Sequence, residues 1–261
     1  GHGGTLDPLA TGVLPIAVGE ATKLAGRMLD GDKVYDFTIQ FGVETDTLDA
    51  EGTVVARSDA PIDGTAVEHV LKDFLGEIDQ RPPAYSALKV NGERAYDLAR
   101  AGGEVLLATR RITIHDLQYL GSTTEGDHHF ATLRAHVSKG TYIRSLARDI
   151  ARALGTVGHV TYLRRIKAGP FTLDQAISLD ILMEKAKARA LEDVTLPMRT
   201  ALDDIPALAI TPEQARLLHF GQVLTGIAAP GGLHLAMNGE TPLALVEVLD
   251  GNVRTVRRFN L

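Results

Sequence analysis

Gly1-His-Gly-Gly-Thr-Leu-Asp-Pro-Leu-Ala-Thr-Gly12 opens the chain. An acidic residue directly before proline is pushed toward extended backbone geometry, so we predict that Asp7 lies on a rigid loop outside any helix. Gly3 and Gly4 permit positive φ angles or the close approach of a ligand. A carboxylate held in this way suits a nucleophile or a base. An ordinary Asp-Pro turn between surface elements fits the same spacing.

The hydrophobic pattern beyond this loop predicts strands and helices in no regular order. Its clearest strand covers 33–42, where Tyr35, Phe37 and Ile39 alternate with polar residues, which places Tyr35 on the core-facing side. The other expected strands cover 11–19, 52–58, 105–120, 130–137 and 159–166, and the expected helices cover 21–29, 67–75, 93–101, 141–154 with Thr141 as cap, 184–191 and 211–219. Since no strand-helix-strand unit repeats, the order predicts an α+β fold with a mainly antiparallel sheet.

The character of the chain changes near Asp204, where one helix, Gly-rich turns and short strands follow. A length of 261 residues with 44% apolar content accommodates one large core and a small second module. We therefore predict a main domain over 1–203 and a small domain over 204–261.

The charge is unevenly distributed along the sequence. A net charge of -6 argues against a nucleic-acid partner when taken alone. Residues 134–167, however, contain eight basic side chains and one acid, whereas acids concentrate over 30–51. Two solvated faces and an RNA-binding surface both fit this segregation.

Several classes of protein are excluded or disfavoured by what the sequence lacks. Without cysteine there are no disulfides or thiolate nucleophiles. The sequence has no apolar run of membrane-spanning length and no signal-peptide pattern, so we expect a cytoplasmic protein, by default a monomer. It has no P-loop or dinucleotide fingerprint, and its histidines show no metal-ligand spacing, so we expect neither a cofactor nor a metal.

The opening stretch resembles the catalytic motif of the bacterial TruB-type tRNA pseudouridine synthases. The similarity continues in order through five further segments: Lys33-Val-Tyr35, Thr45-Asp-Thr-Leu-Asp49, Pro82-Pro-Ala-Tyr-Ser-Ala-Leu-Lys89, Ser138-Lys-Gly-Thr-Tyr-Ile-Arg144 and Tyr162-Leu-Arg-Arg165. The resemblance implies a pseudouridine synthase fold with a mixed, mainly antiparallel central sheet flanked by helices. It also implies a small β-rich, RNA-binding PUA-like domain at 204–261, with Arg254, Arg257 and Arg258 as candidate phosphate contacts.

The activity implied by this resemblance is the conversion of uridine to pseudouridine in the T loop of tRNA, at position 55 in tRNA numbering. Asp7 would attack the target uridine at the ribose or at the ring, which allows the glycosidic bond to break and the base to turn and rejoin through carbon. No cofactor is implied. The uridine must be flipped out of the folded tRNA, which is recognised largely by shape and phosphate contacts.

The resemblance also assigns roles to individual residues. Arg144 would keep the Asp7 carboxylate ionised and oriented, and Tyr35 would stack on the flipped base as a candidate general base. The residues implied to contact the substrate are Tyr142 and Leu163 along the base pocket, His2 in the space that the base leaves, Asp49 in the arginine or tyrosine network, and Lys89 at the pocket or RNA backbone. The candidate RNA-backbone contacts are Lys139, Arg148, Arg164 and Arg165. Taken singly, Tyr35, Tyr142 and Leu163 also fit ordinary core packing.

Three other functions remain open at the level of the sequence. A tRNA-binding folding chaperone would not need the chemistry of Asp7. A glycosidase would use two carboxylates, such as Asp7 and Asp49, across one bond. Ser86 and Lys89 match the Ser-x-x-Lys pattern of serine acyltransferases, although the partner motifs of those enzymes are absent.

Members of the TruB-type family carry some tens of residues ahead of the opening motif, including a first strand. We therefore expect the natural protein to have a segment before Gly1, and the sequence leaves open whether the chain is active without it.

Overall fold

The computed structural model describes residues 1–86, 89–90, 93–94 and 107–260. Contacts divide the chain into two compact units. The central unit consists of Thr5–Leu14 and Asp30–Asp174, and the terminal unit consists of Gly1–Gly4, Pro15–Leu29 and Gln175–Leu261. Each unit combines helices with a sheet, so the predicted α+β class is confirmed.

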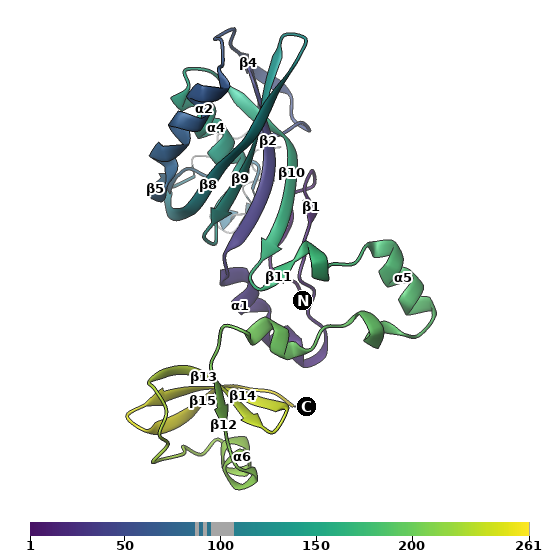
Figure 1. Ribbon diagram of the computed structural model, residues 1–261, viewed down its shortest axis with the longest axis vertical. Coiled ribbons are helices and arrows are strands. Elements are labelled where there is room, and N and C mark those ends of the chain that lie inside the picture. The colour runs from purple at the N-terminus through teal and green to yellow at the C-terminus, as the bar shows by residue number, and fades with distance from the viewer. Residues whose placement is uncertain (87–88, 91–92, 95–106, 261) are drawn as a thin grey trace. The chain divides into compact units, whose positions relative to one another are not determined.

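A seven-stranded sheet forms the centre of the central unit (Figure 1). Its path is β1 (Thr11–Gly12), β10 (Gly158–Ala168), β2 (Lys33–Phe41), β9 (His128–Val137), β8 (Arg110–Glu125) and β5 (Gly76–Gln80), with β11 (Phe171–Thr172) beside β10. Only the pairing of β1 with β10 is parallel within this sheet. The prediction of a mixed, mainly antiparallel sheet is therefore confirmed.

The helices of the central unit cover one face of this sheet (Figure 1). They are α2 (Gly64–Val70), its 3-10 continuation η2 (Leu71–Phe74) and α4 (Ile143–Ala153). In α4, apolar residues at helical spacing are fully buried, among them Leu146 and Ile150, and they pack on the alternating Phe37 and Ile39 of β2. The core of the unit lies between these two layers.

A four-stranded sheet and several short helices form the terminal unit (Figure 1). The sheet has the order β12 (Ala207–Ala209), β13 (Gly232–Asn238), β14 (Thr241–Leu249) and β15 (Asn252–Arg258). Its helix α6 (Pro212–His219) begins at a capping box in which Thr211 and Gln214 satisfy each other's backbone amides. The other helical segments are η1 (Gly19–Leu24), α1 (Ala25–Asp30), η3 (Leu173–Gln175), α5 (Leu179–Lys187), η4 (Leu191–Val194) and η5 (Met198–Leu202), of which α1 and η3 reach into the central unit.

Several predicted boundaries differ from the structure. The strand expected at 11–19 is reduced to the two residues of β1. Tyr142 caps α4 in place of Thr141, whose hydroxyl donates to the Ser138 carbonyl instead. The helix expected at 184–191 is α5, which begins at Leu179 and is capped by Ser178, whose hydroxyl accepts from the Ile181 amide. The strand expected at 52–58 is β4 (Val54–Arg57), which pairs with β3 (Val43–Thr45). The strand expected at 105–120 is β8.

The helix expected at 93–101 lies mostly outside the described residues. Its first two residues form β7 (Glu93–Arg94), which pairs with β6 (Lys89–Val90). Within the described part of the chain, no helix has both the length and the apolar character needed to cross a membrane.

Candidate active site

Asp7 begins a tight turn in the central unit. The Ala10 amide donates to the Asp7 carbonyl at 2.9 Å, and Pro8 occupies the second position of this turn, where its fixed φ angle is favoured. The loop then runs into β1, where Gly12 has a φ of 104° and a Cβ atom would lie 2.1 Å from the Arg165 carbonyl oxygen. Glycine is therefore required at this point, and the prediction that Asp7 lies on a loop outside any helix is confirmed.

The Asp7 carboxylate and the Arg144 guanidinium form a two-point ion pair. Arg144 Nε donates to Asp7 Oδ2 at 2.9 Å, and Arg144 Nη2 donates to Asp7 Oδ1 at 3.1 Å. Such parallel contacts fix the plane of a carboxylate as well as its charge. The Arg144 side chain is 7% exposed and that of Asp7 is 32% exposed, so the carboxylate is held from the protein side and open on the other.

The remaining donors of Arg144 are also occupied. Nη1 binds the Thr47 carbonyl at 3.0 Å and lies 3.4 Å from Asp49 Oδ2, and Nη2 binds the Tyr85 carbonyl at 3.2 Å. Asp49 is almost fully buried, and its other oxygen accepts from the Thr47 hydroxyl at 2.6 Å. The structure therefore brings Asp49 to Arg144, as the resemblance implied, and adds Thr47, which sequence reasoning did not identify.

The loop that carries Asp49 is fixed by its own backbone. Leu48 has a φ of 63°, which is unusual for a residue with a branched side chain. Its carbonyl accepts from the Val160 amide at 3.0 Å, and Asp49 pairs with Val160 in a parallel bridge. This attachment to β10 holds the left-handed residue in place and directs Asp49 toward Arg144.

Tyr35 lies near the start of β2 and packs against the core of the central unit. Burial raises the pKa of its hydroxyl above the ordinary value, and the Asp7 carboxylate acts in the same direction. The Arg165 guanidinium, which hydrogen-bonds the hydroxyl, opposes this shift without reversing it. The phenol is therefore protonated at neutral pH, which favours a donor or stacking role over that of a phenolate base.

The backbone of Tyr142 is held by a residue that sequence reasoning did not identify. Gln80, at the end of β5, is fully buried. Its side-chain carbonyl accepts from the Tyr142 amide at 2.8 Å, and its side-chain amide donates to the Tyr142 carbonyl at 3.2 Å. This two-point contact positions the start of α4, the helix that carries Arg144. Leu163, the other implied pocket residue, is 4% exposed and belongs to the core cluster.

Arg165 does not lie where an RNA backbone contact would require it. The side chain is 1% exposed, so a phosphate cannot reach it. Its Nε donates to the Val13 carbonyl at 2.7 Å, and its Nη1 donates to the Thr5 carbonyl at 3.3 Å. The expected RNA contact is therefore corrected: Arg165 supports the loop on both sides of Asp7. Arg164 and Arg165 are neighbours on β10 and therefore point to opposite faces of the sheet. A pair of arginines gives no sign in the sequence of which one is buried.

Replacing Arg165 by Met is expected to lower the free energy of unfolding by about 3 kcal/mol, because the buried Val13 carbonyl, the partly buried Thr5 carbonyl and the Tyr35 hydroxyl lose their charged donor. The neighbouring Arg164 is exposed, so Arg164→Met is the matched control and should change stability by less than about 0.5 kcal/mol. Urea unfolding followed by circular dichroism measures both. Equal stability of the two variants would contradict the supporting role.

The basic stretch over 134–167 is largely neutralised by acids. Five of its eight cations form ion pairs: Arg134 with Asp36 at 2.7 Å, Lys139 with Asp30 at 2.8 Å, Arg144 with Asp7 and Asp49, Arg148 with Asp149 at 2.8 Å, and Arg152 with Glu44 at 3.2 Å. Four of these acids come from the acidic stretch over 30–51. Among the described residues, Arg164 and Lys167 have no acidic partner and remain the most available cations of this stretch.

The described contacts do not join the other predicted residues to Asp7 or Arg144. His2 is exposed and lies in the terminal unit, where its ring nitrogen Nδ1 accepts from the Gly4 amide at 3.4 Å. Arg254, Arg257 and Arg258 are exposed on β15, and Arg258 donates to the His219 carbonyl. The Lys89 side chain lies outside the described residues. Ser86 is 4% exposed, so its burial disfavours the acyltransferase interpretation.

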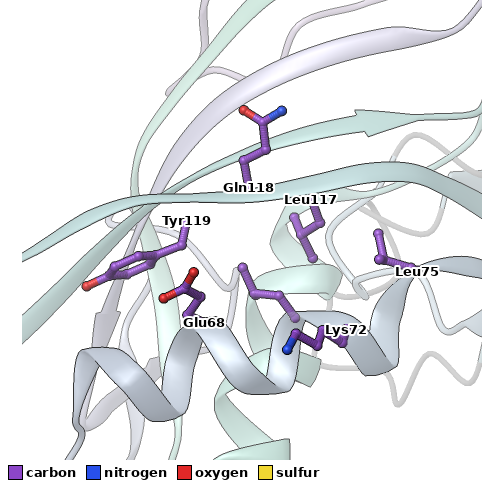
Figure 2. Close-up of a pocket in the computed structure, with 7 residues that line it drawn as sticks. Glu68, Lys72, Leu75, Leu117, Gln118 and Tyr119 are labelled. Atoms are coloured by element: carbon purple, nitrogen blue, oxygen red, sulfur yellow. The ribbon is translucent and has the colours of Figure 1, made fainter.

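The predicted site residues do not line the two described hollows of the surface. The hollow in Figure 2, of about 410 Å³, lies between α2 with η2 and strand β8, and its lining includes Glu68, Lys72 and Tyr119. The second, of about 310 Å³, is lined by Arg57, His128 and eight other residues. Since Asp7 itself is one-third exposed, its carboxylate is accessible without a closed pocket.

Comparison with known proteins identifies relatives of the whole chain. A family model described as "TruB family pseudouridylate synthase (N terminal domain)" matches residues 1–143, and one described as "tRNA pseudouridylate synthase B C-terminal domain" matches residues 144–203. A protein named tRNA pseudouridine synthase B from Novosphingobium aromaticivorans is 63% identical over 262 residues, which cover 100% of this chain and 86% of the relative. The protein of the same name from Zymomonas mobilis is 57% identical over 260 residues, which cover 100% of this chain and 84% of the relative.

Similar folds occur in two solved complexes. A chain of an H/ACA RNP bound to a substrate RNA containing 2'-deoxyuridine has a TM-score of 0.72 and 24% identity, over 100% of this chain and 76% of its own. A chain of a Cbf5-Nop10-Gar1 complex has a TM-score of 0.68 and 26% identity, over 95% of this chain and 69% of its own.

Proposed function

Because the chain belongs to the TruB family of pseudouridylate synthases, we propose that it converts uridine to pseudouridine in tRNA, at position 55 of the T loop. The observation that carries this proposal at the level of the site is the two-point contact between Asp7 and Arg144. Relatives at 63% and 57% identity are named tRNA pseudouridine synthase B, which supports tRNA as the substrate.

In the proposed reaction, the target uridine leaves the stacked T loop and meets the open side of the Asp7 carboxylate. Asp7 attacks either the ribose or the ring, the bond between the ribose and the ring nitrogen breaks, and the base turns and rejoins the ribose through a ring carbon. The bond to Asp7 then breaks, the ring carbon loses its proton, and the freed ring nitrogen gains one. Substrate and product are isomers, so the reaction consumes no oxidant, reductant or energy donor. Arg144 holds both carboxylate oxygens of Asp7 in one plane for the attack.

Tyr35 is proposed to stack on the flipped base and to donate from a protonated hydroxyl. A tyrosine acting as a phenolate base would make turnover rise about tenfold per pH unit below its raised pKa. We expect instead that Tyr35→Phe lowers the single-turnover rate by a factor that stays the same at every pH from about 7 to 9. Rate measurements with unmodified tRNA test this. If the rate rises with pH in the unmodified enzyme and this rise is lost in Tyr35→Phe, Tyr35 acts as a general base and the proposed donor role is wrong.

The two sequence-predicted domains are proposed to divide the work on tRNA. Residues 1–203 would hold the chemistry, and residues 204–261 would form a small RNA-binding domain of the PUA type. The end of the matched family models at residue 203 and the start of β12 at Ala207 support this boundary. The exposed Arg254 and Arg257 of β15, together with Arg164 and Lys167, are the proposed phosphate contacts.

We propose that the enzyme acts as a monomer in the cytoplasm, where tRNA is processed. The glycosidase alternative loses support, since Asp49 is almost fully buried and binds the same guanidinium as Asp7, so it cannot face Asp7 across a sugar bond.

The test of the proposal is incubation of the chain with an unmodified tRNA transcript, followed by chemical mapping of pseudouridine. One modified position, in the T loop, is expected. An unmodified transcript after prolonged incubation, or release of free uracil, would contradict it.

A further inference from the structure

Two histidines and an aspartate from three different parts of the chain meet in the central unit. Asp32 lies directly ahead of β2, His115 lies on β8 and His136 lies on β9. Asp32 Oδ2 is 3.2 Å from His115 Nε2 and 3.7 Å from His136 Nε2. The ring centroids of the two histidines are 4.8 Å apart. The three ligand atoms all lie within 4.8 Å of one another, so both imidazole nitrogens point toward one carboxylate oxygen.

The backbone is shaped so that these side chains share a face of the sheet. In the pairing of β8 with β9, Ile114 lies opposite Val137 and Asp116 lies opposite His136, which makes His115 the extra residue of a β-bulge. Bulges redirect side chains, and here the bulge turns His115 to the side of His136, away from the buried Ile114 and Val137. On β2, Val34 is the partner of His136, so the two side chains lie on the same face of the sheet. Asp32 lies two residues before Val34 and therefore reaches that face as well.

The side chains remain accessible to an ion from solvent. Those of Asp32, His115 and His136 are between 37% and 47% exposed. The neighbouring carboxylate of Asp116 accepts a hydrogen bond from Gln118 and is not part of the group of three ligands. Two imidazoles and one carboxylate are the ligand set that proteins use to bind zinc and related divalent ions while leaving a coordination position for water.

We propose that Asp32, His115 and His136 form a binding site for a divalent transition-metal ion of the zinc class. The ion would replace the close contacts of the two histidines with the shared Asp32 oxygen by three metal-ligand bonds. Because the ligands come from β8, β9 and the residue before β2, the ion would fasten the start of β2 to the β8–β9 hairpin. The site is distinct from Asp7 and Arg144, and its role in binding the ion does not depend on the proposed reaction.

Isothermal titration of the chelator-treated chain with Zn²⁺, without a polyhistidine tag and without RNA, tests the proposal. One ion per chain is expected. Loss of an outer contact to a metal ligand typically weakens binding by about 10- to 100-fold, so His115→Ala and His136→Ala should each weaken it by at least about tenfold. In the unmodified chain Zn²⁺ should also raise Tm, because an ion that binds only the folded state stabilises it.

The matched control is the double variant His128→Ala/His129→Ala on the same hairpin. These histidines lie at the start of β9, outside the cluster, so the variant should bind Zn²⁺ as the unmodified chain does. Circular dichroism of each metal-free variant verifies that it is folded. The proposal is overturned if the unmodified chain shows no saturable binding, or if the His128/His129 variant loses binding while His115→Ala retains it.

Discussion

Replacing Asp7 by Asn is expected to abolish pseudouridine formation while tRNA binding survives. The amide has the shape of the carboxylate and can still accept one hydrogen bond from Arg144, but it has no charge with which to attack the uridine. Removal of a nucleophile from an enzyme commonly lowers turnover by four to six orders of magnitude, and we expect a loss of at least about 10⁴-fold. Single-turnover assays with unmodified tRNA measure the rate, and gel-shift titration measures the affinity.

Asp59→Asn is the matched control, since Asp59 is an exposed carboxylate in the same unit. Its turnover and affinity should equal those of the unmodified chain. Retention of turnover within tenfold in Asp7→Asn would exclude Asp7 as the attacking group. A tRNA-folding chaperone would predict that Asp7→Asn leaves every measurable activity intact, so the same pair of assays separates the two functions.

Replacing Arg144 by Lys is expected to lower turnover by about 10²- to 10³-fold with little change in tRNA affinity. The ammonium keeps the positive charge but cannot hold both oxygens of Asp7 in one plane. A displacement of a reacting group by about 1 Å is enough for a loss of about 10²-fold. Turnover within a few-fold of the unmodified chain would show that charge near Asp7 suffices and that the two-point geometry is dispensable.

Arg144→Met tests the structural side of the same contact. It leaves the buried Asp49 carboxylate without its cation, which should cost about 3 to 5 kcal/mol of unfolding free energy. Adding Asp49→Asn removes that unpaired charge, so the double variant should recover part of the stability while turnover stays absent. Urea unfolding and single-turnover assays measure the two effects. No recovery of stability in the double variant would exclude coupling between Asp49 and Arg144.

Features that depend on neighbouring residues could be predicted from the sequence. The alternation of Tyr35, Phe37 and Ile39 gave the central strand β2, and Thr211 marked the start of α6. The start of α4 was placed one residue early, since Thr141 has the preferred chemistry of a cap but donates to Ser138. The true start, Tyr142, depends on Gln80, a residue 62 positions away, and no local pattern contains that information.

The sequence by itself determined the loop of Asp7, because proline at position 8 and glycine at position 12 restrict the backbone within a few bonds of the residue that they position. Only the tertiary structure decided which charges meet. Four cations of the basic stretch pair with acids about 100 positions away, and Arg165 is buried while Arg164 is exposed. A one-residue bulge turns His115 to His136 and Asp32. Backbone preferences act over neighbouring residues, whereas ion pairing and burial depend on strand order and register, which arise only when distant segments pair.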